Sequence, residues 1–275
     1  MASRLLNHTT AITQFEFDIK DFMELGRALG SLIVPSDDST TIFKEHLMLI
    51  RNYAGNFSLP RWTLNNAETL ATGLRDLIVV LTEPTNTADI MPFEQMATAS
   101  RTLCSLDIAL RWASQGRRNI QNTIILDGRI LRSRYFQGRE TRAERQHRDN
   151  QGFQLIADIH KLVKPEVVLV CNCDQFETSS LLMADLLVSS VSEAGLVETH
   201  TWPSGTKGRV MKSFHPEFVA KCEQLEQRTL RESLFKLTVV MAMNLLLRRQ
   251  IRGPGIKKLR TAVLVGAQGG RAKRS

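Results

Sequence analysis

Apolar positions divide the chain into a helical first quarter and a longer region in which strands alternate with helices. Apolar residues recur at mostly helical spacing between Phe15 and Leu32, and again between Ile42 and Ile50, where Gly55 should end the second helix. A further short helix is expected at residues 66–74. Residues 1–70 are therefore predicted to form an N-terminal helical extension.

From residue 71 onward, short apolar runs alternate with longer helical patterns. The run at 77–81 is unbroken and rich in β-branched residues, as expected of a parallel strand covered on both faces. Three further strands are predicted at 122–127, 166–171 and 209–214, with helices at 94–114, 144–163 and 179–189 between them. This alternation predicts an α/β fold: a three-layer α/β/α sandwich with a central four-stranded, mainly parallel sheet over residues 71–250, plus N-terminal helices and a C-terminal helix within 234–247.

Charge is distributed unevenly along the chain. The net charge is +8, but the ten basic residues after Glu232 are accompanied by no acid. Removing them from the total of 36 leaves 26 basic against 28 acidic residues, so the rest of the chain is close to neutral. Residues 251–275 are therefore predicted to be a basic, disordered tail, suited to nucleic acid or to nuclear import, or simply to solubility.

Composition narrows the class of protein. The 275 residues are 43% hydrophobic with a mean hydropathy of -0.15, which is typical of a globular protein. The first residues lack the sustained apolar core of a secretory signal, and the apolar segment 234–247 contains Lys236 and is too short to span a bilayer. Only Cys171 and Cys173 of the four cysteines are close together, and no histidine pair lies near them at zinc spacing. We therefore expect an intracellular protein, in the nucleus if the tail acts as an import signal, with no membrane segment and no metal or other cofactor.

Polar residues stand at three predicted strand boundaries. Glu83 follows the first strand and precedes Pro84, which removes a backbone donor and turns the chain out of the sheet. Asn122 opens the second strand, and His215 follows the last one. Open α/β sheets bind ligands at the carboxyl ends of their strands, so we expect these three side chains to line one cleft there.

In this order the motifs resemble those of the uracil-DNA glycosylase superfamily. That family has an acid-and-proline motif after the first strand, a Pro-Phe element, an asparagine at the second strand, a Pro-x-Val-Val segment before the third and a His-Pro after the last. The matching segments here are Glu83-Pro84, Pro92-Phe93, Asn122, Pro165-Glu-Val-Val and His215-Pro216, and the resemblance covers residues 77–218.

The resemblance implies hydrolysis of the N-glycosidic bond of a damaged base in DNA without a metal. Its catalytic residues would be Glu83, which positions water and stabilises the cationic sugar, and His215, which donates to the base carbonyl. Asn122, Phe93 and Thr82 would bind the flipped base. An arginine-rich loop after the second strand offers contacts to the DNA backbone, for which we single out Arg129, Arg132 and Arg134.

Structural roles compete with each of these assignments. Phe93 can be a core anchor, Asn122 can cap backbone amides, and the arginine-rich loop can be a solvated face. The sequence also departs from the family motifs, with Leu81, Thr82 and Thr85 in the first and Glu217 after His-Pro. Two alternatives to an active glycosylase therefore remain: a weakened or inactive superfamily member that binds nucleic acid or protein, and a different α/β hydrolase acting on nucleosides through Glu83 and His215.

Overall fold

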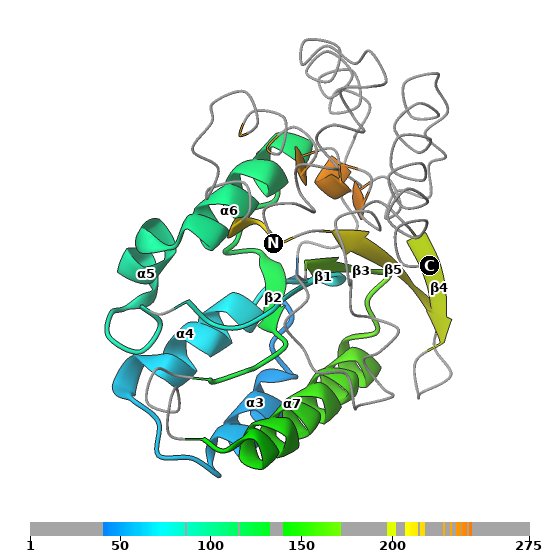
Figure 1. The fold of residues 1–275 in the computed structure, drawn as a ribbon. Coiled ribbons are helices and arrows are strands. Elements are labelled where there is room, and N and C mark those ends of the chain that lie inside the picture. The colour runs from blue at the N-terminus through cyan, green and yellow to red at the C-terminus, as the bar shows by residue number, and fades with distance from the viewer. Residues whose placement is uncertain are drawn as a thin grey trace, which may run out of the picture.

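A five-stranded sheet forms the centre of the molecule (Figure 1). The computed structural model describes residues 41–85, 87–114, 116–132, 140–171, 197–201, 207–213 and 215–217, with single residues and short runs between 228 and 243. The strand order is β2-β1-β3-β5-β4, and the strands are β1 (Leu74–Leu81), β2 (Thr123–Asp127), β3 (Val167–Cys171), β4 (Val197–Thr201) and β5 (Lys207–Ser213).

The first four strands in this order are parallel, which confirms the predicted α/β fold with a mainly parallel central sheet. The fifth strand, β4, pairs antiparallel with β5 at the edge of the sheet and was not among the predicted strands. The chain leaves β1 towards β2 on one side and then crosses to β3 on the other. The carboxyl ends of β1, β2, β3 and β5 therefore lie along one edge, called the carboxyl edge here, with the change of direction between β1 and β3.

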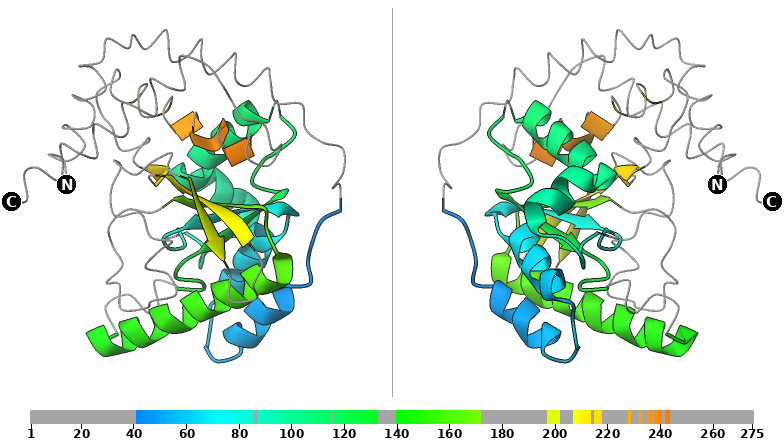
Figure 2. Two further views of the ribbon diagram at one scale, coloured as in Figure 1. Left: turned by 90° about the vertical axis from the view of Figure 1, so that its right-hand side faces the viewer. Right: turned by 90° about the vertical axis from the view of Figure 1, so that its left-hand side faces the viewer.

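Helices cover both faces of the sheet (Figures 1 and 2). Helices α3 and α7 lie on one face, whereas α5 and α6 lie on the other, and α4 lies beside β2. The helices are α3 (Leu47–Ala54), α4 (Arg61–Ala71), α5 (Phe93–Ala99), α6 (Arg101–Ala113) and α7 (Arg142–Val163). Helices α3 and α4 fall within the predicted N-terminal extension and pack into the same core as the strands.

The alternation of side chains along β1 builds the two halves of the core. Leu77 and Val79 join the buried cluster beneath α5 and α6, and Ile78 and Val80 join the one beneath α3 and α7. Both faces are apolar because both are covered, which is why the strand appears as one continuous hydrophobic run. The described residues between 228 and 243 are helical, and Phe235 and Val239 are buried in the first cluster, as the predicted C-terminal helix requires.

Several helices differ from their predicted bounds. The second predicted helix begins at Leu47 rather than near Ile42, because Phe43 pairs with Gly73 in an isolated antiparallel bridge. The helix expected at 94–114 is two helices, because Ser100 has an extended backbone and its hydroxyl caps α6 by accepting from the Leu103 N–H. Helix α4 begins directly after Pro60, five residues before the helix that the apolar pattern indicated. The predicted elements at 15–32 and 179–189 and the predicted tail at 251–275 lie outside the described residues. No helix among the described residues is long and apolar enough to cross a membrane.

Candidate functional site

The loops that follow β1 and β2 are joined at the carboxyl edge. The strands pair in a register that sets Leu81 opposite Asp127, and the pairing continues beyond the strands. Gly128 N–H donates to the Leu81 carbonyl oxygen at 2.7 Å, and Arg129 N–H donates to that of Thr82 at 3.1 Å. The backbone leading into Glu83 is therefore fixed against the loop that carries the arginines.

Glu83 is held by two arginines of that loop. Arg132 Nη1 donates to Glu83 Oε2 at 2.6 Å, and Arg129 Nη1 lies 3.3 Å from the same oxygen. The Glu83 side chain is 33% exposed, whereas those of Arg129 and Arg132 are 8% and 11% exposed. The acid thus keeps access to solvent, with the positive charges behind it.

Asp149 on α7 anchors Arg129 from the other side. Arg129 Nε donates to Asp149 Oδ1 at 2.9 Å and Nη2 donates to Oδ2 at 3.0 Å, a bidentate pair that fixes the plane of the guanidinium group. Close backbone packing supports this contact: a Cβ on Gly152 of α7 would lie 3.1 Å from the Gly128 carbonyl oxygen. Helix α7 therefore positions Arg129, and Arg129 helps to position Glu83.

Two of the three arginines that were predicted to contact the DNA backbone, Arg129 and Arg132, are buried in ion pairs with acids. Arg129 and Arg132 turn towards Glu83 and are largely buried, because the loop reverses at Leu131, which has a left-handed backbone (φ 61°) and is itself buried. Both guanidinium groups are thus bound by acids rather than exposed on a solvated face, and their contact with the DNA backbone stays a prediction. Arg134 lies outside the described residues.

Asp127 is a second acid at this edge, and it was not among the predicted site residues. It is the last residue of β2 and is only 9% exposed. Burial, and to a smaller extent the nearby negative charge of Glu83, raises its pKa to about 7. The signal was present in the sequence: an acid closes an apolar strand here, the same pattern that drew attention to Glu83. A carboxyl group that titrates near neutral pH can both give and accept a proton.

His215 follows β5 and lies at the same edge. Its ring is 7% exposed, and Nδ1 accepts a hydrogen bond from the Glu217 N–H at 3.3 Å, so the neutral ring carries its proton on Nε2. Strand β3 separates β5 from β1, which puts the two strand ends about 10 Å apart. Glu83, Asp127 and His215 thus share one edge of the sheet, as expected for Glu83 and His215.

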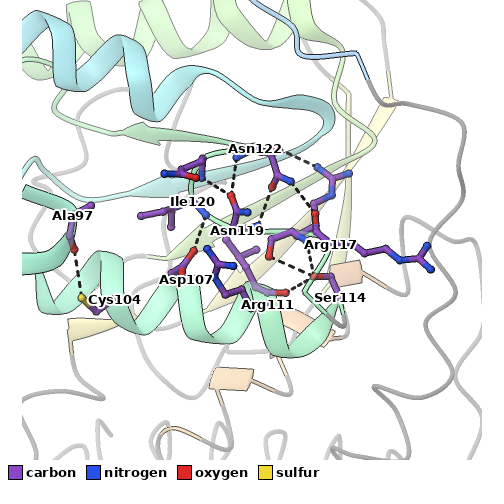
Figure 3. Close-up of polar contacts among 12 residues, drawn as sticks. Ala97, Cys104, Asp107, Arg111, Ser114, Arg117, Asn119, Ile120 and Asn122 are labelled. Carbon is purple, nitrogen blue, oxygen red and sulfur yellow. Dashed lines mark hydrogen bonds and ion pairs between the residues drawn. The ribbon is translucent and has the colours of Figure 1, made fainter. Parts of the chain in front are cut away.

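Asn122 lies at the opposite edge, and its predicted place in the cleft is wrong. It precedes the first residue of β2, and the amino ends of parallel strands point away from the edge that carries Glu83. Its side chain caps a turn instead: Oδ1 accepts from the Asn119 N–H and Nδ2 donates to the Arg117 carbonyl, both at 2.8 Å (Figure 3). The alternative structural role, capping of backbone groups, is the one observed.

Phe93 and Thr82 are both buried. Phe93 is the first residue of α5 and lies with Met96 in the hydrophobic cluster on that face of the sheet, 4% exposed. This is the core position that the alternative interpretation gave it. Thr82 is equally buried and takes part in the site through its carbonyl oxygen, which accepts from Arg129.

No cluster of three or more histidine, cysteine, aspartate or glutamate side chains suited to a metal ion occurs within the described part of the chain. Comparison with models of known protein families finds no match, and no curated protein matches the sequence.

Proposed function

We propose that this chain is a uracil-DNA glycosylase-like protein that hydrolyses the N-glycosidic bond of a damaged base in DNA at the carboxyl edge of its sheet. One observation carries the proposal. Asp127 pairs with Leu81, two residues before Glu83, and the two acids have contrasting surroundings: Glu83 is paired with two arginines, and Asp127 is buried with a pKa of about 7. Two acids in unlike environments are the arrangement that hydrolyses O-glycosidic bonds, and cleavage of an N-glycosidic bond also leaves positive charge on the sugar.

Glu83 and His215 can stabilise the two charges that develop when the N-glycosidic bond breaks. Cleavage leaves positive charge on the sugar, which the partly exposed carboxylate of Glu83 would stabilise while it orients the attacking water. Negative charge develops on the departing base, where the Nε2–H of His215 is a suitable donor. These are the roles that the sequence motifs implied for both residues.

Asp127 can make the hydrogen bonds to the base that Asn122 was expected to make. A protonated carboxyl group presents one donor and one acceptor, the same pair that a side-chain amide offers to the edge of a base. Because its pKa is about 7, a substantial fraction of Asp127 is protonated at neutral pH. Asp127 therefore replaces Asn122 as the base-binding residue in this proposal.

A second candidate function is a non-catalytic nucleic-acid-binding or protein-binding module on the same scaffold. The observation that favours it is the ion-pair network: Glu83 is engaged by Arg132 and Arg129, and Arg129 is fixed by Asp149. Such a network has a structural use whether or not the site is active. The two functions make opposite predictions for base release.

The test is release of base from single- and double-stranded oligonucleotides that carry uracil or another damaged base, detected by alkaline cleavage of the abasic product. The protein should release a base, and Glu83→Gln, which keeps the shape and removes the charge, should slow release by on the order of a hundredfold. Glu68→Gln is the matched control, because Glu68 pairs with a single arginine, Arg51, on α3, far from the carboxyl edge. Normal folding with DNA binding but no release of any base would establish the binding module instead.

A further inference from the structure

Residues 41–46 lead the chain into the described fold and are held by two side chains that stack on each other. Phe43 and His46 are the inward-facing residues of this segment, and its other four residues are exposed. The two rings lie 5.5 Å apart, centre to centre, and are within 4° of parallel. The side chains of the segment therefore attach it to the fold at one place, where these two rings stack.

Both residues also bind the chain between α4 and β1. Phe43 N–H donates to the Gly73 carbonyl oxygen at 2.8 Å, and His46 Nε2 lies 2.7 Å from the Ala71 carbonyl oxygen. A carbonyl oxygen can only accept a hydrogen bond, so the neutral ring carries its proton on Nε2. The segment is thus joined to residues 71–73 at the amino ends of the strands, opposite to the carboxyl edge.

The surroundings of His46 favour its neutral ring. The side chain is 0% exposed, and Nδ1 has no hydrogen-bond partner within the described part of the chain. Burial lowers the pKa of His46, and the hydrogen bond with the Ala71 carbonyl opposes this effect only in part. A proton on Nδ1 would place a charge and an unsatisfied donor inside the protein, which is costly. The ring therefore takes up a proton more readily once it has left this position.

The titratable side chains around His46 do not provide a partner for Nδ1. Those at this end of the neighbouring elements are exposed, or paired with one another, or buried on α7 in the case of His160. They are Lys44 and Glu45 in the segment itself, Arg51 on α3 with Glu68 on α4, Arg75 and Asp76 on β1 with Arg118, and Asp158, His160 and Lys161 on α7. None of them makes a hydrogen bond to Nδ1, and Asp127 lies at the opposite end of β2.

We propose that His46 is a pH-sensitive latch, and that its protonation releases residues 41–46 from the end of α4 while the sheet stays folded. The geometry supports a local opening, because the segment has no inward side chain besides this ring and the ring stacked on it. It also supports control by a proton, because one ring nitrogen is bonded and the other is buried without an acceptor. The latch is independent of the proposed function, since it lies opposite to the edge that carries Glu83 and His215.

The latch opens as the pH falls. In the open state the ring has its ordinary pKa of about 6.5, whereas in the closed state its pKa is lower. The open state therefore binds the proton first, and the equilibrium shifts towards it by up to about tenfold for each pH unit below about 6.5. The shift ends once the pH is below the pKa of the closed state. Above about pH 6.5 the ring is neutral in both states, so the equilibrium no longer depends on pH.

Hydrogen exchange of the full-length chain, followed by NMR, tests the latch. The Phe43 amide reports its opening, because this N–H is bound to Gly73 in the closed state. Its protection factor, which corrects for the intrinsic effect of pH on exchange, should fall by up to about tenfold per unit below about pH 6.5. The amides of β3 (Val167–Cys171), in the middle of the sheet, should keep their protection.

His46→Gln separates titration of the ring from its hydrogen bond. The glutamine amide can donate to the Ala71 carbonyl oxygen but binds no proton in this pH range, so protection of the Phe43 amide should lose its dependence on pH. His147→Gln is the matched control, because it makes the same change at an exposed histidine of α7 and should keep the wild-type dependence. NMR titration of the wild-type rings needs no variant, and His46 should stay neutral and protonated on Nε2 at about pH 6.5.

Each result decides whether the latch exists. Constant protection of the Phe43 amide from about pH 7.5 to 5, or the same pH dependence in His46→Gln, would overturn it. A parallel loss of protection in β3 would show that acid unfolds the whole protein rather than this segment. A His46 ring that titrates at its ordinary pKa in the folded protein would also overturn the latch, and this measurement decides even where His46→Gln does not fold.

Discussion

The buried carboxyl group of Asp127 lowers the free energy of unfolding of this protein at neutral pH. The pKa of Asp127 is raised from 3.8 to about 7 by burial and by Glu83, so between these values the folded protein binds a proton that the unfolded chain has released. The free energy of unfolding therefore falls as the pH rises from about 4 to 7, and the loss is complete above pH 7. Three pH units correspond to about 4 kcal/mol.

Asp127→Asn should remove this dependence. At pH 5 most of the penalty is absent from both proteins, whereas at pH 8 only the wild-type protein buries a charge. The variant should therefore gain stability relative to the wild type between pH 5 and pH 8, by about 3 kcal/mol, measured by urea unfolding at the two pH values. An equal difference at both would show that Asp127 ionises at its ordinary pKa.

Gly73 allows the chain at the start of β1 to approach the backbone of β2 closely. A Cβ at Gly73 would lie 2.5 Å from the backbone nitrogen of Ile124 and from the carbonyl carbon of Thr123, closer than such atoms approach. Gly73→Ala should therefore force β1 away from β2 and cost about 2 kcal/mol or more, measured as a loss of thermal stability. Gly55→Ala is the control, since its Cβ would meet nothing closer than 3.4 Å, and it should change stability little.

The residues of the site show what the sequence could predict. Glu83 and His215 were predicted at the carboxyl edge and lie there, because each comes just after a strand and directly before a proline. A simpler rule, that the polar residue at the end of a strand lies at this edge, also selects Asp127, which ends β2, and excludes Asn122, which precedes it. The family motif pointed to Asn122, but the direction of a strand decides which edge of the sheet its first and last residues occupy.

At the scale of elements, α7 and the two strand-end loops act as one unit through Arg129. The Arg129 side chain is 8% exposed and binds Asp149 at both carboxylate oxygens. Asp149→Ala would leave the guanidinium group buried without that partner, which typically costs about 3 kcal/mol. Chemical denaturation should show this loss of stability as a lower transition midpoint.

The matched comparison is Arg51→Ala, which breaks an ion pair whose arginine is 60% exposed. Solvent-exposed pairs contribute little, so this variant should unfold close to the wild-type denaturant concentration. A result in which Asp149→Ala is as mild as Arg51→Ala would show that α7 does not hold the loop.

The sequence predicted a helix or strand correctly where its hydrophobic pattern alone determines it. Strands β1 and β3 are covered on both faces, so each contains an unbroken apolar run, as in Val167–Cys171. Strand β4 has Glu198, Thr199 and His200 in succession, and an edge strand with so few apolar residues leaves no such run. The break at Ser100 was missed because apolar spacing continues across it, while the decisive feature is a hydroxyl that caps α6.

Across the whole chain, the excess of positive charge belongs to the residues that follow Glu232 in the sequence. The described arginines nearest the site, Arg129 and Arg132, are paired with Glu83 and Asp149 and add little free positive charge there. The ten basic residues after Glu232 account for more than the entire net charge of +8. Affinity for the phosphate backbone is therefore expected to come from that part of the sequence.

Removal of residues 253–275 should weaken DNA binding without changing base preference. The segment contains six basic residues, Lys257, Lys258, Arg260, Arg271, Lys273 and Arg274, and bonds to phosphate supply affinity but carry no sequence information. The slope of log K against log salt should become shallower by about 0.9 for each phosphate of duplex DNA that the shortened protein does not neutralise, measured by fluorescence anisotropy between about 50 and 200 mM salt.

Replacement of the six residues by glutamine in the full-length chain is the matched control and should reproduce the truncation, because charge rather than length is responsible. Unchanged affinity and slope in both variants would exclude this segment as the source of DNA affinity, and weaker binding in the truncation alone would assign the effect to its apolar residues.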